Sequence, residues 1–485
     1  MIYQSTRGSK NFVTSTNAVL NGIAEDGGLY MPKDLDYSKF NWKELIGLTT
    51  LEMASKILGF FLDDFENPFD VISRAYMDKF DTEELTPVKK VGDRYVLELF
   101  HGPTSAFKDV ALSVLPQLMM DGKKAINENR KIVILTATSG DTGKAALEGF
   151  HDIEGIEIFV FYPDGGVSPV QRLQMATQAG ENVHVCAVKG NFDDCQTGVK
   201  NIFNYVKENG IPVDKNVILS SANSINIGRL VPQIVYYFKA YSDLIKFNAI
   251  SLNDPIDFTV PTGNFGDILA GYLAKKMGLP IGKLICASNS NNVLTDFIRT
   301  GVYNKNRDFY KTISPSMDIL VSSNLERLLF MVSDNNSDVT KDLMNKLSKE
   351  GSYKISKDML AKIQDDFDAD FASDAQVLGT IKSVFDDYSY LMDTHTASAW
   401  CVSNKFNYGR PNVVLSTASP YKFPGAVASA LQLKSSDDEF ELMRAISSKT
   451  NTEIPRNLSS LNSKDVRFTD VIDKDKMMDY IMNNI

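Results

Sequence analysis

The sequence is poor in the residues that most often build metal sites and covalent cross-links. Its 485 residues include four cysteines and four histidines. The cysteines form no Cys-x-x-Cys pair, and the histidines are equally scattered, so their spacing predicts neither a disulfide framework nor a bound metal. Reduced thiols in a cytoplasmic protein are the expected state of the four cysteines, which are Cys186, Cys195, Cys286 and Cys401.

Long apolar runs and clusters of basic residues are also missing. No apolar stretch reaches the roughly 18 residues that a membrane-spanning helix needs. Residues 1–7 have neither a signal-peptide core nor an arginine-rich transit pattern. The net charge of −10 argues against nucleic acid or a membrane surface as a partner. An acidic total does not exclude an anionic substrate, because local donors decide its binding.

What remains has the composition of an ordinary globular protein. Hydrophobic residues make up 43% of the chain and charged residues 23%, and the length exceeds what one core usually holds. Between about 130 and 330, β-branched runs alternate with helical stretches, which predicts a largely parallel sheet with ligands at the carboxyl ends of its strands. The expected strands are 131–136, 157–162, 216–219 and 258–260.

Two regions outside this alternation have a different pattern. Residues 1 to about 95 are expected to be mostly helical, and about 333–390 to form an acidic, helical, peripheral insertion. Segment 366–370 has the spacing of a calcium loop. We exclude that site because Phe371 stands where the loop needs glycine and Val377 where it needs glutamate.

One lysine stands where a strand gives way to a helix. The apolar run 95–100 leads through a turn to a helical run from Val110, which places Lys108 in or just before the first helical turn. The helix macrodipole disfavours an ammonium there, so the amine is more easily held neutral. A neutral lysine amine can form a Schiff base with a carbonyl cofactor. From position alone, a lysine reaching into solvent is the simpler interpretation.

Glycine-containing loops follow two predicted strands. In loop 138–146, two glycines let backbone N–H groups face an anion at a helix start. It is not a P-loop, because Thr138 stands where that motif needs glycine and Ala145 where it needs Ser or Thr. Loop 261–267 brings backbone donors to a helix N-terminus, which suits a phosphate dianion. A capped helix start and a structural turn remain the simpler alternatives for the two loops.

Polar side chains follow two other strands. Ser224 and Asn226 precede Arg229 after strand 216–219, a donor set that can hold a phosphoryl group, although a salt-bridged arginine at a helix entry is an equal alternative. Thr417 follows strand 413–415, where a hydroxyl that merely ends a strand is the alternative. His395 is expected to be a hydrogen-bonded structural residue rather than a base.

In this order, the segments resemble threonine synthases, which are fold-type II enzymes dependent on pyridoxal phosphate (PLP). The resemblance covers nearly the whole chain, and its Ser-Gly-Asp-Thr-Gly loop is similar to the subgroup with the longer chain. Many fold-type II enzymes have Asn where Asp141 stands, so the partner of Asp141 stays open. The matching segments are 3–8, 26–32, 99–109, 138–146, 220–230, 261–267 and 413–424, with 314–324 and 393–397 matching without clear chemistry.

The resemblance implies an α/β fold with two open, twisted, mostly parallel sheets flanked by helices, an N-terminal helical region and a helical insertion. It implies an N-terminal threonine synthase region at 1–95 and a small α/β domain at 130–215. Residues 96–129 and 216–485 would form the large PLP-binding domain, with the insertion at about 333–390. A monomer or a homodimer is expected.

The resemblance also implies roles for single residues. Lys108 would carry PLP and, once freed, act as the catalytic base. Loop 263–267 would bind the PLP phosphate, and Thr417 would meet the pyridine nitrogen. The implied cofactor-binding residues are Lys108, Gly263, Asn264, Phe265, Gly266, Asp267 and Thr417. The implied substrate-binding residues are Ser139, Asp141, Thr142, Ser224, Asn226 and Arg229.

The implied activity is that of a PLP-dependent carbon–oxygen lyase acting on phosphates. It converts O-phospho-L-homoserine and water to L-threonine and phosphate, the last step of threonine biosynthesis. Two alternatives remain open: an O-phosphohomoserine phospho-lyase that gives 2-oxobutyrate, ammonia and phosphate, and a non-catalytic PLP-binding protein. A nucleotide-binding protein is disfavoured because the P-loop pattern fails.

Overall fold

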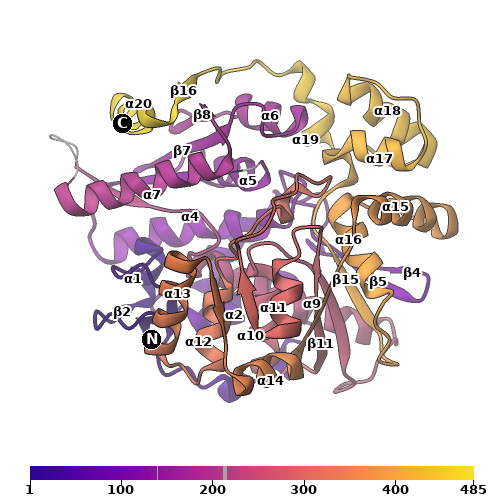
Figure 1. Ribbon diagram of the computed structural model, residues 1–485, viewed down its shortest axis with the longest axis horizontal. Helices are drawn as coiled ribbons and strands as arrows, with labels where there is room; N and C mark the ends of the chain where they lie inside the picture. Colours follow the sequence, from indigo (N-terminus) through magenta and orange to yellow (C-terminus); the bar gives the residue numbers. More distant parts are fainter. Residues whose placement is uncertain (139, 211–215) are drawn as a thin grey trace.

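Two mostly parallel sheets, each covered by helices, form the frame of the molecule, as expected (Figure 1). The computed structural model describes residues 1–138, 140–210 and 216–485. The smaller sheet lies above the larger one in Figure 1, and the polypeptide crosses between them several times. Among the described residues, no helix is both long and apolar enough to cross a bilayer.

The larger sheet has six strands and is parallel except for its last pair, β5 and β4. Alternate side chains face opposite cores: Val96 and Val414 pack beneath α15 (Asp374–Tyr388) and α16 (Thr394–Ser403), whereas Leu97 and Leu415 face the central core. The strand order is β14 (Phe367–Phe371), β11 (Ile281–Ser288), β10 (Ile256–Pro261), β15 (Asn412–Ser416), β5 (Arg94–Glu98) and β4 (Val88–Val91).

The smaller sheet has five parallel strands, and the expected strands at 131–136 and 157–162 form its centre. Its apolar faces are covered by α4, α5 and α6 on one side and by α7 and α20 on the other. The strand order is β16 (Val471–Asp473), β8 (Val183–Lys189), β7 (Ile156–Pro163), β6 (Lys131–Ala137) and β9 (Val217–Ser220). Strands β9 and β16 join it from outside the range 130–215.

The helices vary widely in length. Those of the amino-terminal half are α1 (Ser15–Asn21), α2 (Thr50–Phe61), α3 (Pro68–Tyr76), α4 (Lys108–Ala125), α5 (Asp141–Phe150), α6 (Pro169–Ala176), α7 (Phe192–Asn209), α8 (Ile227–Leu230) and α9 (Val235–Lys246). The later ones are α10 (Gly266–Lys276), α11 (Val293–Thr300), α12 (Leu325–Val332), α13 (Ser337–Glu350), α14 (Lys357–Asp366), α15 (Asp374–Tyr388), α16 (Thr394–Ser403), α17 (Pro424–Ala430), α18 (Glu439–Thr450), α19 (Arg456–Ser459) and α20 (Met477–Asn484).

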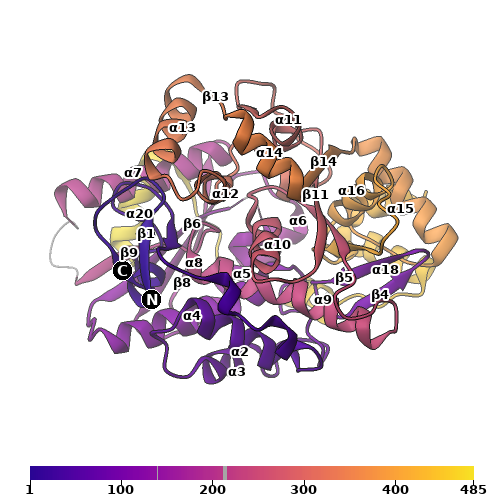
Figure 2. The same ribbon diagram turned by 90° about the horizontal axis from the view of Figure 1, so that it is seen from below.

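The N-terminal region is less helical than the sequence predicts. Besides α1–α3 it contains an antiparallel sheet of β2 (Val13–Thr14), β1 (Ile2–Ser5) and β3 (Tyr30–Pro32). These strands are too short for a periodic pattern, and their pairing joins segments far apart in the chain. Figure 2 shows α2, α3 and α4 on the side of the molecule opposite to α13 and α14.

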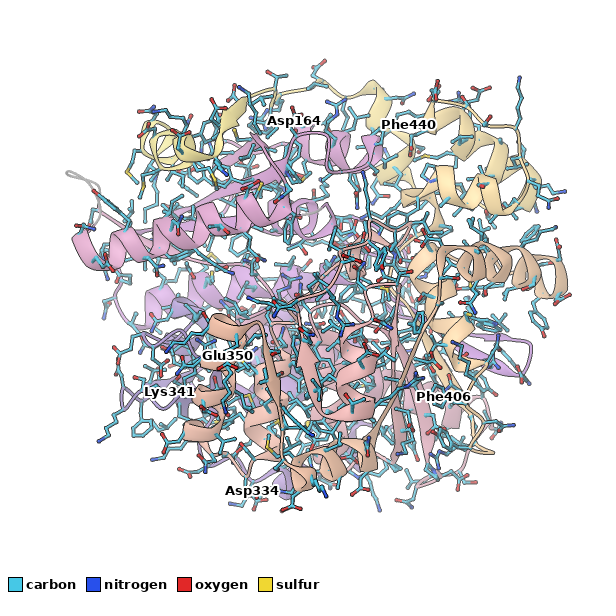
Figure 3. The ribbon with its side chains drawn as sticks, viewed as in Figure 1. Asp164, Asp334, Lys341, Glu350, Phe406 and Phe440 are labelled. Carbon is cyan, nitrogen blue, oxygen red and sulfur yellow. The ribbon has the colours of Figure 1, made fainter. Side chains whose placement is uncertain are left out.

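The insertion at 333–390 is peripheral and mostly helical, as predicted, and its charged side chains Asp334, Lys341 and Glu350 are exposed (Figure 3). A two-stranded antiparallel sheet, β12 (Val302–Asn304) with β13 (Ser352–Lys354), ties it to the body. The prediction missed β14, which adds an edge strand to the larger sheet within the segment that resembles a calcium loop. Phe367 and Ala369 are buried there, and Asp370 pairs with Arg299 at 2.7 Å, so the alternating acidic residues have a structural role.

A histidine clamp holds the chain just after β5. His101 Nδ1 lies 2.6 Å from Asp81 Oδ1, and Nε2 lies 3.0 Å from Glu98 Oε2. Burial opposes protonation of His101, but the hydrogen bonds and charges of both carboxylates outweigh it and raise its pKa to about 9. The folded chain therefore keeps a proton that the unfolded chain, with a His pKa of 6.5, releases at lower pH.

This clamp predicts a loss of stability in mild alkali. Its contribution to the free energy of unfolding is complete below pH 6.5 and declines as the pH rises through the pKa of about 9 that His101 has in the folded chain. Between pH 6.5 and 9 the melting temperature of the wild type should fall by roughly 2 to 4 °C more than that of His101→Gln. Calorimetry across this range measures both curves, and parallel curves would contradict the clamp.

Candidate functional site

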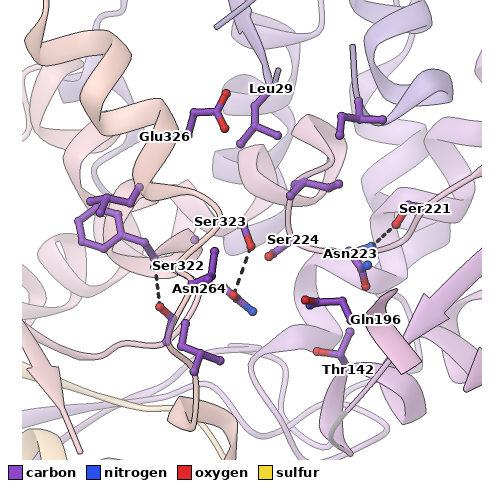
Figure 4. A pocket seen from close by; sticks show the side chains of 18 of the residues that line it. Leu29, Thr142, Gln196, Ser221, Asn223, Ser224, Asn264, Ser322, Ser323 and Glu326 are labelled. Atoms are coloured by element: carbon purple, nitrogen blue, oxygen red, sulfur yellow. Dashed lines mark hydrogen bonds between the residues drawn. The ribbon is translucent and has the colours of Figure 1, made fainter. Parts of the chain in front are cut away.

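A cavity of about 960 Å³ lies between the two sheets, where loops that follow β5, β6, β9, β10 and β15 meet. Figure 4 shows Thr142 and Gln196 reaching it from α5 and α7, which cover the smaller sheet, Asn264 from the loop after β10, and Ser323 from the loop before α12. Carboxyl ends of parallel strands are the usual place for a ligand in such sheets. The motifs predicted from the sequence are thus brought together around one space.

Lys108 is the first residue of α4, and it lines the cavity with a side chain that is 11% exposed. Its segment is held by a turn in which the Thr104 N–H donates to Asp109 Oδ2 at 2.8 Å. Burial lowers the pKa of Lys108 to about 8, aided by the charges of Arg229 and Lys422 and opposed by those of Asp141 and Asp109. About a tenth of the amine is therefore neutral at pH 7, far more than for an ordinary lysine with a pKa of about 10.4.

Asp141 begins α5 and lies behind the cavity wall rather than along it. Its Oδ1 lies 2.8 Å from Lys422 Nζ, and its Oδ2 lies 3.9 Å from Lys108 Nζ and accepts from Ser316 Oγ at 3.2 Å. Burial opposes its ionisation, but the charges of both lysines and hydrogen bonds from Lys422 and Gln171 hold its pKa well below the usual range. These contacts supply the partner of Asp141 that the sequence left open.

Loop 261–267 has the shape of an anion site. Phe265 has a φ of 63°, a left-handed conformation that non-glycine residues rarely adopt, and it directs the chain into the first turn of α10. N–H groups in a first turn have no partner within their helix. Asp267 is buried, and its Oδ2 has no hydrogen-bond partner among the described residues. Burial raises the pKa of Asp267 to about 7, so its charge can be absent beside an anion.

Residues 314–324 brace this loop, which explains a segment without assigned chemistry. Ser322 Oγ donates to the Gly263 carbonyl at 2.8 Å, and the Asn324 N–H donates to the Asn264 carbonyl at 3.0 Å. A Cβ atom at Gly263 would lie 2.7 Å from the Ser316 carbonyl oxygen. Glycine is therefore required where the two loops touch.

We expect Gly263→Ala to weaken cofactor binding. The new methyl group would push one loop away from the other, at a cost of about 1 to 3 kcal/mol, which corresponds to a loss of affinity of roughly 5- to 150-fold. Titration of the apoprotein with PLP, followed by absorbance, measures the change. Gly379→Ala is the matched control, because a Cβ there meets nothing within 4 Å. Equal affinities for the two variants would contradict the steric argument.

The loop after β9 places Arg229 in the cavity wall. Arg229 is 4% exposed, and its Nη1 donates to the Ala222 carbonyl at 2.8 Å. No carboxylate lies within ion-pair distance of it in the described part of the chain. Burial lowers the pKa of Arg229 to about 10, so its guanidinium remains charged at neutral pH. A buried cation without a carboxylate partner suits an anionic ligand.

The other predicted residues of this segment separate into two groups. Ser224 lines the cavity, together with Ser221 and Asn223. Asn226 does not: it is fully buried, its Nδ2 donates to the Val19 carbonyl at 2.9 Å, and its Oδ1 accepts from the Gly228 N–H at 2.9 Å. These contacts make Asn226 a helix-capping residue rather than a substrate ligand. Ser139 lies outside the described residues.

Two further residues singled out in the sequence line the same cavity. Thr417 lines the cavity, and its carbonyl accepts from the Phe107 N–H at 2.9 Å, which ties it to the lysine segment. His395 also lines the cavity. Its Nδ1 lies 2.8 Å from Asp393 Oδ1, and its Nε2 accepts from the Ser316 N–H at 3.2 Å. Both ring nitrogens are thus engaged, in agreement with the predicted structural histidine.

This donor set fits PLP, the cofactor that the resemblance implies. An amine with a lowered pKa, a helix N-terminus behind a glycine loop, and a hydroxyl group lie along one cavity. The sequence missed Ser316, which lines the cavity, and Lys422, which lies behind it, and both contact Asp141. Only their matches in runs 314–324 and 413–424 could have pointed to them, since both contacts join segments distant in sequence.

Comparison with known proteins gives matches along most of the chain. Residues 2–76 match the family model "Threonine synthase N terminus", residues 84–345 match "Pyridoxal-phosphate dependent enzyme", and residues 396–481 match "Threonine synthase, C-terminal". The second model alone covers more than half of the chain.

Three relatives illustrate the similarity. Human "Threonine synthase-like 1" is 41% identical over 435 residues, which are 86% of this chain but only 58% of that protein. A threonine synthase from Pseudomonas aeruginosa is 39% identical over 89% of this chain and 90% of its own. A PLP-bound threonine synthase from Brucella melitensis superposes with a TM-score of 0.87 at 36% identity, covering 100% of this chain and 99% of its own.

Proposed function

The chain belongs to the threonine synthase family of PLP-dependent enzymes, and we propose that it converts O-phospho-L-homoserine and water to L-threonine and phosphate. The observation that carries this proposal is that one cavity holds a partly neutral lysine and a buried arginine with no carboxylate partner among the described residues. Lys108 would supply the amine that PLP needs to act on the carbon next to the substrate amino group. Arg229 would supply a cation for the substrate phosphate. In this role the protein would complete threonine biosynthesis in the cytoplasm.

PLP would be held by groups from three elements. Lys108 Nζ would bind its carbonyl carbon, the N–H groups of loop 263–267 its phosphate, and the Thr417 hydroxyl its ring nitrogen. When bound, PLP withdraws electrons from the carbon next to the substrate amine. A hydroxyl at the ring nitrogen does not force protonation there, unlike a carboxylate, and so moderates this withdrawal.

Lys108 would then act as the base. Freed from the cofactor, its Nζ would accept the proton from the substrate α-carbon, and a pKa of about 8 keeps it ready for that step near neutral pH. Asp141, behind the cavity wall, would stabilise the protonated lysine, because its Oδ2 lies 3.9 Å from the amine. The proton thus stays on a group that can return it later in the cycle.

The loop after β9 would bind the phosphate of the substrate. Arg229 provides a planar pair of donors, and Ser221, Asn223 and Ser224 add hydroxyl and amide donors along the same wall (Figure 4). The same groups would stabilise the charge that grows on the phosphate as it departs. Thr142, which lines the cavity at the start of α5, is the proposed contact for the substrate carboxylate.

A phospho-lyase, the alternative that the resemblance leaves open, is the second candidate. Product analysis separates the candidates. PLP-loaded protein is incubated with O-phospho-L-homoserine, and phosphate, threonine and 2-oxobutyrate are measured together. We expect threonine and phosphate in equal amounts. A yield of 2-oxobutyrate and ammonia would favour the phospho-lyase, and a lack of phosphate release would exclude both.

A further inference from the structure

A second lysine, Lys422, is buried beneath the site and has no place in the proposed reaction. Its side chain is fully buried and does not line the cavity. Lys422 Nζ lies 2.8 Å from Asp141 Oδ1 and donates to the Thr104 carbonyl at 3.0 Å. A buried ammonium is costly unless it is paired, so this position needs both contacts.

The turn that carries Lys422 is fastened to the segment that carries Lys108. The Phe107 N–H donates to the Thr417 carbonyl at 2.9 Å, and the Ser419 N–H donates to the Ser105 carbonyl at 3.1 Å. The contact of Lys422 with Thr104 adds a third link. Lys422 is therefore held at a fixed place relative to Lys108, and Asp141 lies between the two amines.

We propose that Lys422 is a positioning residue for Lys108: through its ion pair it fixes the Asp141 carboxylate and neutralises most of its charge, which leaves the Lys108 amine free to lose its proton. This inference rests on the proposed role of Lys108. Without Lys422, Asp141 would have Lys108 as its one lysine partner and would hold it as an ammonium. An ammonium can neither bind a carbonyl carbon nor accept a proton.

The charges around Lys108 determine in which direction the loss of Lys422 shifts the pKa of Lys108. Asp141 and Asp109 favour its protonated form, whereas Arg229 and Lys422 disfavour it. Loss of Lys422 removes one of two opposing cations and releases the full charge of the nearer carboxylate. Loss of both Lys422 and Asp141 removes a pair of opposite charges, so the two effects should largely cancel.

The test measures the protonation of Lys108 in the apoprotein. Competitive trace labelling with acetic anhydride at a series of pH values, followed by digestion and mass spectrometry, gives its apparent pKa. We expect a value near 8 in the wild type, a rise of about one unit in Lys422→Met, and a fall in Asp141→Asn. In the double variant the apparent pKa of Lys108 should return close to the wild-type value. Lys422→Arg keeps the positive charge, so it should also leave that pKa near the wild-type value.

Lys239→Met is the matched control, because Lys239 is also a buried lysine, paired with Asp243 four residues along α9. It should leave the labelling curve of Lys108 unchanged. If Lys422→Met folds and also leaves that curve unchanged, the inference is wrong. Should Lys422→Met not fold, Lys422→Gln decides: its amide can keep the hydrogen bond to the Thr104 carbonyl but carries no charge, so the apparent pKa of Lys108 must still rise, and an unchanged labelling curve would overturn the ion-pair argument.

A kinetic measurement separates positioning from a general structural role. In the PLP-loaded enzyme, Lys422→Met should lower kcat at neutral pH, and kcat should recover in mild alkali as Lys108 loses its proton. KM should stay nearly unchanged, because Lys422 does not line the cavity. A loss of kcat that is the same at every pH would contradict the inference. Since the labelling uses no substrate, failure of the proposed function would not affect that result.

Discussion

Replacing Lys108 by alanine is expected to reduce turnover by at least about 1,000-fold, because the change removes both the covalent attachment of the cofactor and the base. The visible absorbance of the lysine-bound cofactor should be lost as well. The fold should survive, since Lys108 begins α4 and its side chain faces the cavity rather than the core. Turnover, absorbance and the melting temperature of the variant are the three measurements.

The control for this variant is Lys124→Ala, an exposed lysine in the last turn of the same helix. It should retain full turnover and absorbance. A Lys108→Ala protein that is folded and active would show that another amine carries the cofactor. A variant that does not fold would instead point to a structural role for Lys108 that its position does not suggest.

Replacing Arg229 by glutamine is expected to lower kcat/KM by roughly 10- to 100-fold. Charge-assisted hydrogen bonds contribute about 1.5 to 3 kcal/mol, and about 1.4 kcal/mol corresponds to a factor of ten. Because Arg229 also lowers the pKa of Lys108, the variant should show an alkaline shift of its pH profile. Arg229→Lys keeps the charge but loses the planar pair of donors, and should be intermediate.

Steady-state kinetics give kcat/KM, and inhibition by inorganic phosphate reports on phosphate binding. In Arg229→Gln we expect kcat/KM to fall and phosphate inhibition to weaken together. Arg444→Gln is the control, because the Arg444 side chain is 61% exposed and lies away from the cavity. A folded Arg229→Gln enzyme with unchanged kcat/KM and unchanged phosphate inhibition would place the phosphate elsewhere.

Much of the site could be predicted from the sequence because its loops follow strands. Periodic apolar runs located β6, β7, β9 and β10. Glycine or hydroxyl residues just after such runs lie at the carboxyl ends of the strands, where parallel sheets bind ligands. The position of Lys108 at the start of a helix followed from the same reasoning. Local patterns therefore sufficed for the cavity groups that directly follow these strands, but not for Gln196, Ser316 or Ser323.

The groups behind the cavity could not be predicted in this way. The ion pair of Asp141 with Lys422 joins two loops that are far apart in the chain, and no local pattern records such a contact. Asn226 shows the opposite error: it has the residue type of a ligand, but the packing of α8 against α1 uses its amide for capping. In each case tertiary contacts, rather than the local sequence, decide the role.

Strands formed by distant pairing were also missed. Strand β14 lies in an acidic helical segment and is recognisable only by its pairing with β11, where Phe367 and Ala369 turn inward. Strands β1 and β3 are short and depend on each other in the same way. Short strands lack the length over which an alternating pattern can be detected.

The most direct test of this account is to identify the residue that binds the cofactor. The PLP-loaded protein is reduced with borohydride, digested, and searched for peptides that carry the reduced cofactor. We predict a single labelled residue, Lys108, and no label in the Lys108→Ala variant. Label on Lys422 or on any other lysine, or no label at all, would contradict the assignment of Lys108 on which the proposed reaction depends.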